Sequence, residues 1–319
     1  MRTVYVDRRD SRLTVDHDRL LVDIPEHPRP LSLPLLQIKT VVIASQTTLD
    51  SRVLLKLSEC GIGLVVLNPT HAEQSMMSIP NSHGHSARRL AQYRLVQDDK
   101  MIQDACRSLV LFRLKSQIKL LMTLTSSHPH AAYKLRQAAQ QLRELWQQYA
   151  TNQTLSVAQW RGVEGSGARM FFAGLAAALP AWTAFTGRNR RPPKDPVNVL
   201  LSLTYTIVHA ECVRALYAVG LDPMLGVYHQ ADYGRASLAC DLTEMLRSHV
   251  DRWVVQLIAK QFLLEAHFSR SEKYPCVLGK AGRAIYYEQL ETQMKTWRRM
   301  LRLLAHRWAE RVLQSMPEA

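Results

Sequence analysis

The spacing of apolar residues changes once along the chain, near residue 87, and this change constrains the fold more than any other feature. Before it, short runs over residues 3–6, 12–15, 20–24, 41–43 and 63–67 are typical of strands separated by polar turns. The first three runs indicate an antiparallel meander. Only residues 49–60 have helical spacing here, with Asp50 or Ser51 near the start and Gly61 as the stop.

After residue 87 the spacing is helical to the end of the chain. The expected helices cover residues 88–125, 133–149, 164–179, 197–219, 237–247, 253–268 and 284–313. Glycine and proline punctuate the segments between them. The sequence therefore predicts an α+β fold in which a small β-rich N-terminal domain, residues 1–86, precedes a larger, mostly α-helical domain, residues 87–319.

Positive charge is unevenly distributed over a chain whose net charge is +14. Residues 1–99 hold 12 Lys/Arg and 11 Asp/Glu, whereas residues 100–319 hold 29 and 16. Neutralisation of phosphates by Lys and Arg dominates nucleic-acid binding. We therefore expect the second domain to meet nucleic acid; the alternative is an ordinary solubilising basic surface.

Several classes of protein find no support in the sequence. The five cysteines are scattered and form no C-x-x-C pair, which argues against a disulfide framework and a structural zinc site. No phosphate-binding or dinucleotide fingerprint is present. We find no apolar run of about 18 residues and no signal-peptide pattern, so we expect a cytoplasmic protein without a membrane segment.

Acidic side chains nevertheless occur within this basic domain. Ser237 is a good helix N-cap candidate, and a helix from there places Asp241 and Glu244 on one face, with His229 on the preceding loop. One imidazole with carboxylates suits Mg²⁺ or Mn²⁺ and phosphate chemistry. Spacing alone leaves open an exposed acidic helix face beside an unrelated histidine.

A further acidic residue, Glu164, precedes Gly165, Gly167 and an apolar pattern with helical spacing. The glycines indicate a close approach by another backbone or by a ligand. The alternative is that Glu164 favours the positive end of the helix dipole. The basic, proline-stiffened segment 187–195 is equally compatible with a phosphate clamp and with a solvated turn.

Taken in order, four segments resemble the CRISPR-associated endonuclease/integrase family that inserts new spacers during adaptation. Residues 162–172 resemble its Glu-Gly helix start, and residues 195–205 its D-P-V-N-x-L-L segment. Residues 218–229 are similar to its A-x-G-L-D-P-x-x-G-x-x-H stretch, and residues 234–244 to its G-R-x-S-L-x-x-D-L-x-E helix. The combination is specific, although no single segment is.

This resemblance implies that Glu164, His229 and Glu244 bind a divalent ion, Mg²⁺ or Mn²⁺, with Asp241 as a nearby fourth acidic group; these four are the expected catalytic residues. It also implies metal-dependent DNA nicking and a transesterification that joins prespacer 3′-OH ends to the CRISPR repeat. The β-rich domain is expected to form a homodimer. A small ferredoxin-like Cas protein is the expected partner in a higher-order complex.

Contact with double-stranded DNA is expected mainly through phosphates. The candidate residues are Arg188, Arg190, Arg191, Lys194, Arg235 and Arg247. Asp232 departs from the family pattern, which often has Arg at this position. Two alternatives remain open: a stand-alone structure-specific DNA repair nuclease, and a non-catalytic DNA-binding scaffold.

Overall fold

The computed structural model describes residues 2–68, 75–78, 86–151, 155–189, 192–230, 232–271 and 275–314. The chain divides into two compact units. The first consists of Met1–His83 with Tyr287–Lys295, and the second of Gly84–Tyr286 with Thr296–Ala319. The predicted α+β class, with strands before helices, is confirmed.

The first unit contains two four-stranded sheets, ordered β1-β5-β7-β8 and β4-β3-β2-β6. The strands are β1 (Arg2–Val6), β2 (Ser11–Asp16), β3 (Arg19–Asp23), β4 (Leu31–Pro34), β5 (Ile38–Ile43), β6 (Thr47–Leu49), β7 (Gly63–Val66) and β8 (Met76–Ser78). Helix α1 (Ser51–Glu59) begins at Asp50, whose side chain accepts a hydrogen bond from the Arg52 backbone N–H. The prediction left Asp50 and Ser51 open as the start of this helix, and Asp50 is the N-cap.

The predicted meander of the first three strands is wrong for β1. It pairs in parallel with β5, in a different sheet from β2 and β3. The chain passes between the sheets over residues 7–10, where Asp10 adopts a left-handed conformation (φ 58°) and its N–H bonds to the Gln46 carbonyl. The alternation of apolar and polar residues within a strand does not indicate a parallel partner more than thirty residues away in the sequence. The alternation therefore predicted the strand but not its partner.

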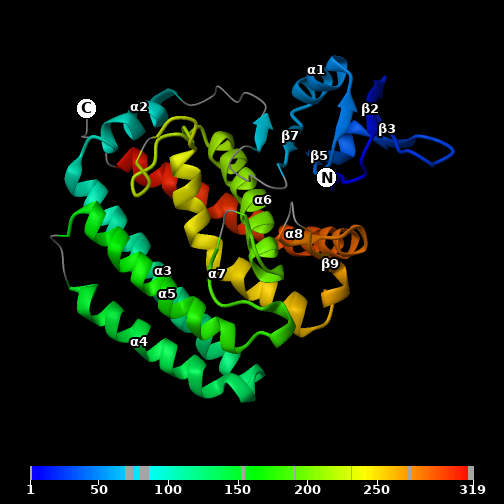
Figure 1. Cartoon of the computed structure of the whole chain (residues 1–319). Coiled ribbons are helices and arrows are strands. Elements are labelled where there is room, and N and C mark those ends of the chain that lie inside the picture. The colour runs from blue at the N-terminus through cyan, green and yellow to red at the C-terminus, as the bar shows by residue number, and fades with distance from the viewer. Residues whose placement is uncertain are drawn as a thin grey trace. The chain divides into compact units, whose positions relative to one another are not determined.

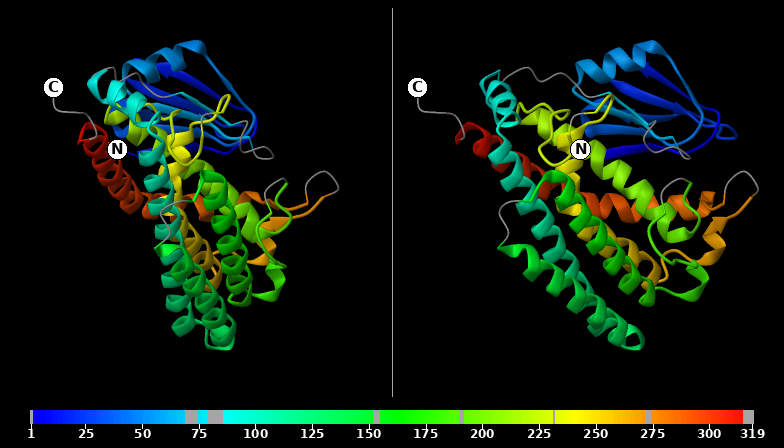
Figure 2. Two further views of the ribbon diagram at one scale, coloured as in Figure 1. Left: turned by 90° about the vertical axis from the view of Figure 1, so that its left-hand side faces the viewer. Right: turned by 60° about the vertical axis from the view of Figure 1, so that its left-hand side comes forward.

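The second unit is built from long helices (Figure 1). They are α2 (Ser86–Leu95), α3 (Asp99–Ser127), α4 (Ala132–Ala150), α5 (Val157–Ala177), α6 (Pro196–Ala218), α7 (Ser237–Ala259) and, in part, α8 (Lys280–Gln314), with a short hairpin of β9 (Phe268–Ser269) and β10 (Val277–Leu278). Helix α3 packs against α4, α5 and α7, and α6 packs against α7. The turned views in Figure 2 show α3, α4 and α5 running side by side.

Three predicted helix boundaries are corrected. Residues 88–125 form two helices, because Asp98 caps the start of α3. Residues 237–247 and 253–268 were predicted as two helices, but α7 is continuous to Ala259, since Asp251 is accommodated inside the unit by a hydrogen bond from Tyr205. Helix α5 begins seven residues before Glu164, where Ser156 and Gln159 form a capping box.

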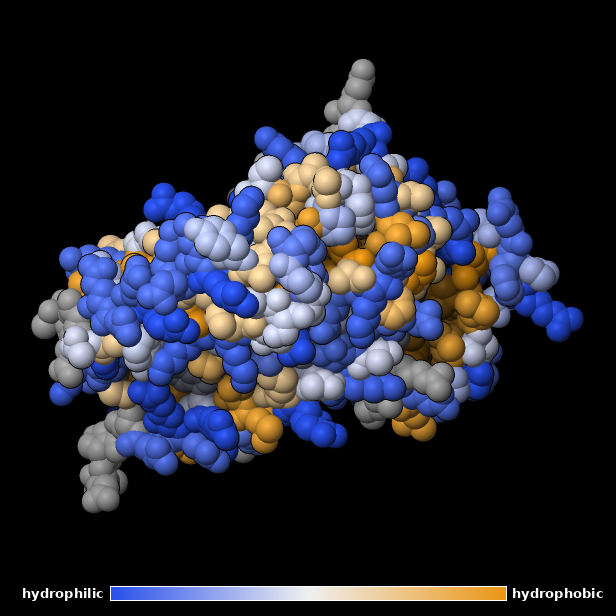
Figure 3. Space-filling view, turned by 90° about the horizontal axis from the view of Figure 1, so that it is seen from below, coloured by the Kyte–Doolittle hydropathy of each residue, from blue (hydrophilic) through white to orange (hydrophobic). Residues whose placement is uncertain are grey.

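Burial follows the helical pattern, and most residues of α6 are buried. It is the single helix in the described residues that is long and apolar enough to cross a membrane, and 67% of its most apolar window is buried within the protein. Burial of this extent is typical of a core helix. Figure 3 shows one face of the surface, where hydrophilic side chains predominate and apolar ones are exposed between them.

Candidate active site

The loop between α6 and α7 carries His229 and is tied to α7 by one buried carboxylate. Asp241 is 1% exposed. Its Oδ2 accepts hydrogen bonds from the backbone N–H groups of Val227 (2.7 Å) and Tyr228 (3.1 Å). Its Oδ1 accepts from the His229 backbone N–H (2.9 Å) and pairs with His229 Nδ1 (2.7 Å). Asp241 therefore fixes both the loop and the imidazole ring.

These contacts determine which imidazole nitrogen remains available. A carboxylate accepts hydrogen bonds, so Nδ1 carries a proton, and Nε2 is the nitrogen that bears the lone pair in the neutral ring. A histidine that ligates a metal commonly donates its other N–H to a carboxylate in this way. The four donors around Asp241 fill the usual acceptor positions of its two oxygens. Asp241 therefore positions His229 and does not itself offer a free oxygen to a metal ion.

The loop also depends on Gly226. A Cβ at this position would lie 2.6 Å from the His229 carbonyl oxygen and 2.7 Å from the Ser237 carbonyl carbon. Glycine permits this approach of two backbones. The predicted cap is corrected here: Ala236 occupies the N-cap of α7, and the Ser237 hydroxyl donates to the Gln230 carbonyl (2.9 Å). Both contacts hold the loop against the start of α7.

Glu244 lies one turn further along α7, with a side chain only 2% exposed. Its Oε2 forms an ion pair with Arg113 of α3, and its Oε1 lies 2.9 Å from Arg247 Nε. The Arg113 side chain, itself 3% exposed, also has its Nε 3.6 Å from Glu164 Oε1. Arg113 therefore lies between two glutamates contributed by different helices, and it supplies the cation that buried carboxylates require.

Glu164 projects from the third turn of α5, and its Oε2 accepts a hydrogen bond from the Tyr228 hydroxyl (2.6 Å). The alternative that Glu164 stabilises a helix start is wrong, because α5 begins at Val157. Gly167 does have a packing reason, since a Cβ there would lie 2.4 Å from Leu114 Cδ2. Nothing lies within 4 Å of the corresponding point on Gly165.

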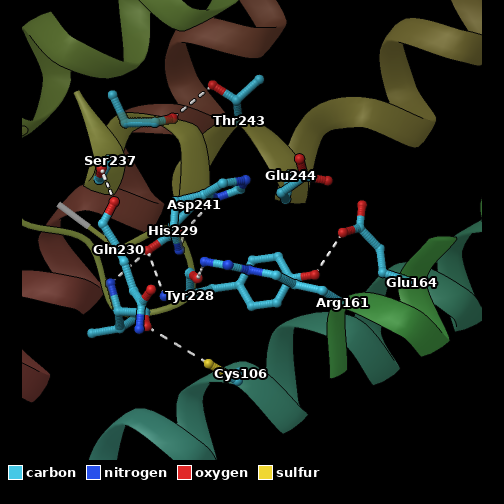
Figure 4. Close-up of polar contacts among 12 residues, drawn as sticks. Cys106, Arg161, Glu164, Tyr228, His229, Gln230, Ser237, Asp241, Thr243 and Glu244 are labelled. Carbon is cyan, nitrogen blue, oxygen red and sulfur yellow. Dashed lines mark hydrogen bonds and ion pairs between the residues drawn. The ribbon is translucent and has the colours of Figure 1, made fainter. Parts of the chain in front are cut away.

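Figure 4 shows Glu164, Glu244, Tyr228 and His229 gathered in one region of the second unit. Arg161, one turn before Glu164 on α5, reaches into the same region, and its guanidinium donates to the Tyr228 carbonyl (3.3 Å). Sequence reasoning missed Arg161 and Arg113. The position of Arg113 among apolar residues at helical spacing (Val110, Leu114, Leu121) is a signal that points to a buried cation.

A second polar cluster adjoins Glu244 through Arg247. The Tyr205 hydroxyl donates to Asp251, and the guanidinium carbons of Arg247 and Arg188 lie 4.8 and 5.6 Å from the Tyr205 ring centroid. Burial raises the pKa of Asp251 to about 6, although the Tyr205 hydrogen bond and the arginines oppose the shift. Burial also raises the pKa of Tyr205, helped by the Asp251 charge.

Four of the six predicted DNA-binding residues lie in the described part of the chain, and these four fall into two groups. Arg188 donates to Asn198 and Ser202 side chains of α6, and Arg247 pairs with Glu244, so both are engaged within the unit. Lys194 is exposed and Arg235 is half-buried. Arg190 and Arg191 lie outside the described residues. As DNA contacts, all six stay predictions.

The donor chemistry around Glu164, His229 and Glu244 fits a hard divalent cation: carboxylate oxygens and one imidazole nitrogen with its other nitrogen fixed by Asp241. As the side chains stand, both Glu244 oxygens are paired with arginines. In the described part of the chain, no group of three or more His, Cys, Asp or Glu side chains is arranged around one metal position.

Comparison with known proteins points in one direction. The family model described as "CRISPR associated protein Cas1" matches residues 4–292. A relative from Thermodesulfovibrio yellowstonii, named CRISPR-associated endonuclease Cas1 1, is 32% identical over 315 residues, which is 98% of each chain.

Two solved structures share the fold. A casposase bound to integration product superposes with a TM-score of 0.84 at 20% identity, covering 100% of this chain and 92% of that one. A chain of a Cas6-RT-Cas1–Cas2 complex superposes with a TM-score of 0.82 at 22% identity, covering 98% of this chain and 35% of that one. These identities support the fold alone.

Proposed function

Because the chain belongs to the CRISPR-associated protein Cas1 family, whose curated relative is named an endonuclease, we propose that it is the endonuclease and integrase of CRISPR adaptation. Its substrates are double-stranded DNA: a prespacer with 3′-OH ends and the CRISPR repeat. Glu164, His229 and Glu244 would hold Mg²⁺ or Mn²⁺, and Asp241 orients His229. The protein acts in the cytoplasm.

One observation supports this assignment above the others: the contact of His229 Nδ1 with Asp241 Oδ1 at 2.7 Å. A surface histidine needs no such partner, and the carboxylate leaves Nε2 as a ligand nitrogen in the region shared by Glu164 and Glu244 (Figure 4). The acids on α5 and α7 already share the Arg113 guanidinium, which supports this region as one that favours a cation.

The proposed reaction is a phosphoryl transfer. A prespacer 3′-oxygen loses its proton and forms a bond to a repeat phosphorus, while the bond from that phosphorus to the repeat 3′-oxygen breaks. A bound divalent ion would polarise the phosphoryl oxygen, favour the ionised hydroxyl and neutralise the leaving oxygen. Water in place of the 3′-OH gives nicking at the same centre.

The chain's own residues position this chemistry. Asp241 fixes the His229 ring, and the Tyr228 hydroxyl fixes one Glu164 oxygen. Arg161 lies on the same face of α5 as Glu164, and its guanidinium makes one hydrogen bond of 3.3 Å. With five N–H donors, a guanidinium is suited to a second, bidentate contact with a phosphate. We assign Arg161 to the reacting phosphodiester.

We further propose that residues 1–86 form the dimerisation domain and residues 87–319 the catalytic and DNA-binding domain. A homodimer would work with a small ferredoxin-like Cas protein. The solved Cas6-RT-Cas1–Cas2 complex contains a chain with this fold, and the presence of Cas2 in that complex supports such a partner.

A half-site integration assay tests the proposal. Wild-type protein with the Cas partner and Mn²⁺ should join a prespacer 3′ end to repeat DNA, and His229→Ala and Glu244→Gln should abolish joining while retaining DNA binding. Glu144→Gln on the exposed face of α4 is the matched control and should be fully active. Retained joining by either site variant would overturn the assignment.

The assay also separates the alternatives. A stand-alone repair nuclease would cleave branched DNA without the partner and would join no prespacer. A non-catalytic scaffold would bind DNA with no turnover at any concentration of divalent ion.

A further inference from the structure

The last turns of α8, residues 296–314, have two faces of opposite character. The buried face consists of Trp297, Leu301, Ala305, Ala309 and Val312, each 0–1% exposed. Their spacing of four, four, four and three residues forms one continuous apolar stripe. This stripe is the side of the helix that is buried in the unit.

The rest of the helix circumference is exposed and mostly basic, with Leu303 (58%) exposed among the cations. We call its cationic members, Arg299, Arg302, His306, Arg307 and Arg311, the α8 basic stripe. Glu310 is the one acidic residue between positions 296 and 314. Among the described residues, no hydrogen bond or ion pair engages these five side chains, whereas Arg298 beside them is paired with Glu211 (2.9 Å).

The α8 basic stripe contributes nothing to folding that the structure shows. Like charges three or four residues apart, as at Arg299 and Arg302 or Arg307 and Arg311, destabilise a helix by about 0.2–0.5 kcal/mol per pair. A polyanion would remove this repulsion. Arg299 to Arg311 spans about 18 Å along a helix, which is the length of about five base pairs of duplex DNA.

We propose that the α8 basic stripe binds the phosphate backbone of duplex DNA, as a contact area separate from the candidate active site. The choice of duplex DNA as the polyanion rests on the proposed function, whose substrates are double-stranded DNA. Four of the five cations are arginines, whose planar guanidinium matches phosphate oxygens. Between positions 296 and 314, no Trp, Tyr or Phe is among the exposed large apolar residues. Stacking on unpaired bases, the usual basis of single-strand binding, is therefore not favoured.

The test is the salt dependence of duplex binding by the full chain. In one variant, Arg299, Arg302, Arg307 and Arg311 are changed to Gln. In the control, the same charge is removed from exposed residues of α3 and α4 by Lys100→Gln, Lys134→Gln, Arg136→Gln and Arg143→Gln. Fluorescence anisotropy with a duplex of random sequence, about four helical turns long, gives log Kd against log [KCl].

Each phosphate contact contributes about 0.9 to the slope, so the α8 variant should lose about 3 to 4 from it and the control less than about 1. The double variants R299Q/R302Q and R307Q/R311Q should each lose about half, provided that far-UV circular dichroism is unchanged. An equal loss of slope in both four-residue variants, or no loss of slope in the α8 variant, would overturn the proposal. Loss of binding to an acidic protein in the α8 variant, without a loss of slope for duplex DNA, would also overturn it.

The outcome is distinguishable from that of the proposed function. Duplex binding through α8 in a protein without metal-dependent cleavage would sink the proposed function alone. Metal-dependent cleavage by a wild-type protein whose salt slope does not depend on α8 would sink the α8 contact alone.

Discussion

The Asp241 carboxylate holds His229 at two points, since one oxygen, Oδ1, contacts both the backbone N–H (2.9 Å) and the ring Nδ1 (2.7 Å) of that residue. Two further backbone N–H groups bond to the other oxygen. A single side chain thus links the tautomer of the histidine to the conformation of its loop.

Asp241→Asn should weaken Mn²⁺ binding by about 10- to 100-fold, because the amide places an N–H₂ group against N–H donors and releases the imidazole. Isothermal titration calorimetry with Mn²⁺ measures this directly. Asp232→Asn, on the exposed part of the same loop, is the control and should bind Mn²⁺ as the wild type does. Unchanged affinity in D241N would refute the positioning role of Asp241.

Arg113→Met should destabilise the protein by about 3–5 kcal/mol, because it removes the buried partner of the buried Glu244 carboxylate. Urea unfolding at neutral pH provides the free energy. Adding Glu244→Gln to R113M should restore part of the loss, since the neutral amide removes one uncompensated charge. Arg136→Met on exposed α4 should change stability by less than about 0.5 kcal/mol. Strictly additive effects of R113M and E244Q would contradict a direct pair.

Tyr228→Phe removes the hydroxyl that fixes Glu164 and little else, since the ring is retained. Glu164 is 22% exposed on its side chain, so water replaces the lost donor and stability should fall by less than about 1.5 kcal/mol. The concentration of Mn²⁺ that supports half-maximal nicking should nevertheless rise several-fold, with duplex binding unchanged. Tyr133→Phe, at an exposed tyrosine, should leave that concentration as it is. An equal metal requirement in Y228F would exclude a role for the hydroxyl.

Asp251 gives stability a pH dependence of defined sign. Burial raises its pKa from 3.8 to about 6, so the native state favours the protonated acid. The stability contributed by this group is full below its unfolded pKa and is lost as the pH rises through about 6. Between about pH 5 and about pH 7.5, the wild type should lose about 1–2 kcal/mol relative to Asp251→Asn. Parallel unfolding profiles of the two proteins would contradict this.

The sequence predicted the division into strands and helices because burial repeats every two residues in one region and every three to four in the other. It did not predict that β1 pairs with β5, since register across a sheet depends on residues far apart in the chain. It divided α7 at residues 248–252 because Ser, His, Asp and Arg there resemble a surface break. Asp251 instead lies inside, with Tyr205 as its donor.

Only part of the candidate site could be predicted from the sequence. Spacing placed Asp241 and Glu244 on one helix face, whereas the grouping of Glu164, His229, Asp241 and Glu244 came from the family resemblance; the structure brings the four into one unit. Arg113 and Tyr228, which contact these acids, belong to no motif: the apolar neighbours of Arg113 indicate a buried cation, but they do not indicate its partners. Their roles follow from side-chain contacts across α3, α5 and α7.

We propose above all that Glu164, His229 and Glu244 form one divalent-metal centre. Electron paramagnetic resonance titration of Mn²⁺ into the purified protein, without DNA, tests it most directly. We predict one strongly bound Mn²⁺ per chain in the wild type and in the control Glu144→Gln, and loss of that ion in Glu164→Gln, His229→Ala and Glu244→Gln alike. Undiminished Mn²⁺ binding in any one of the three site variants would contradict the account.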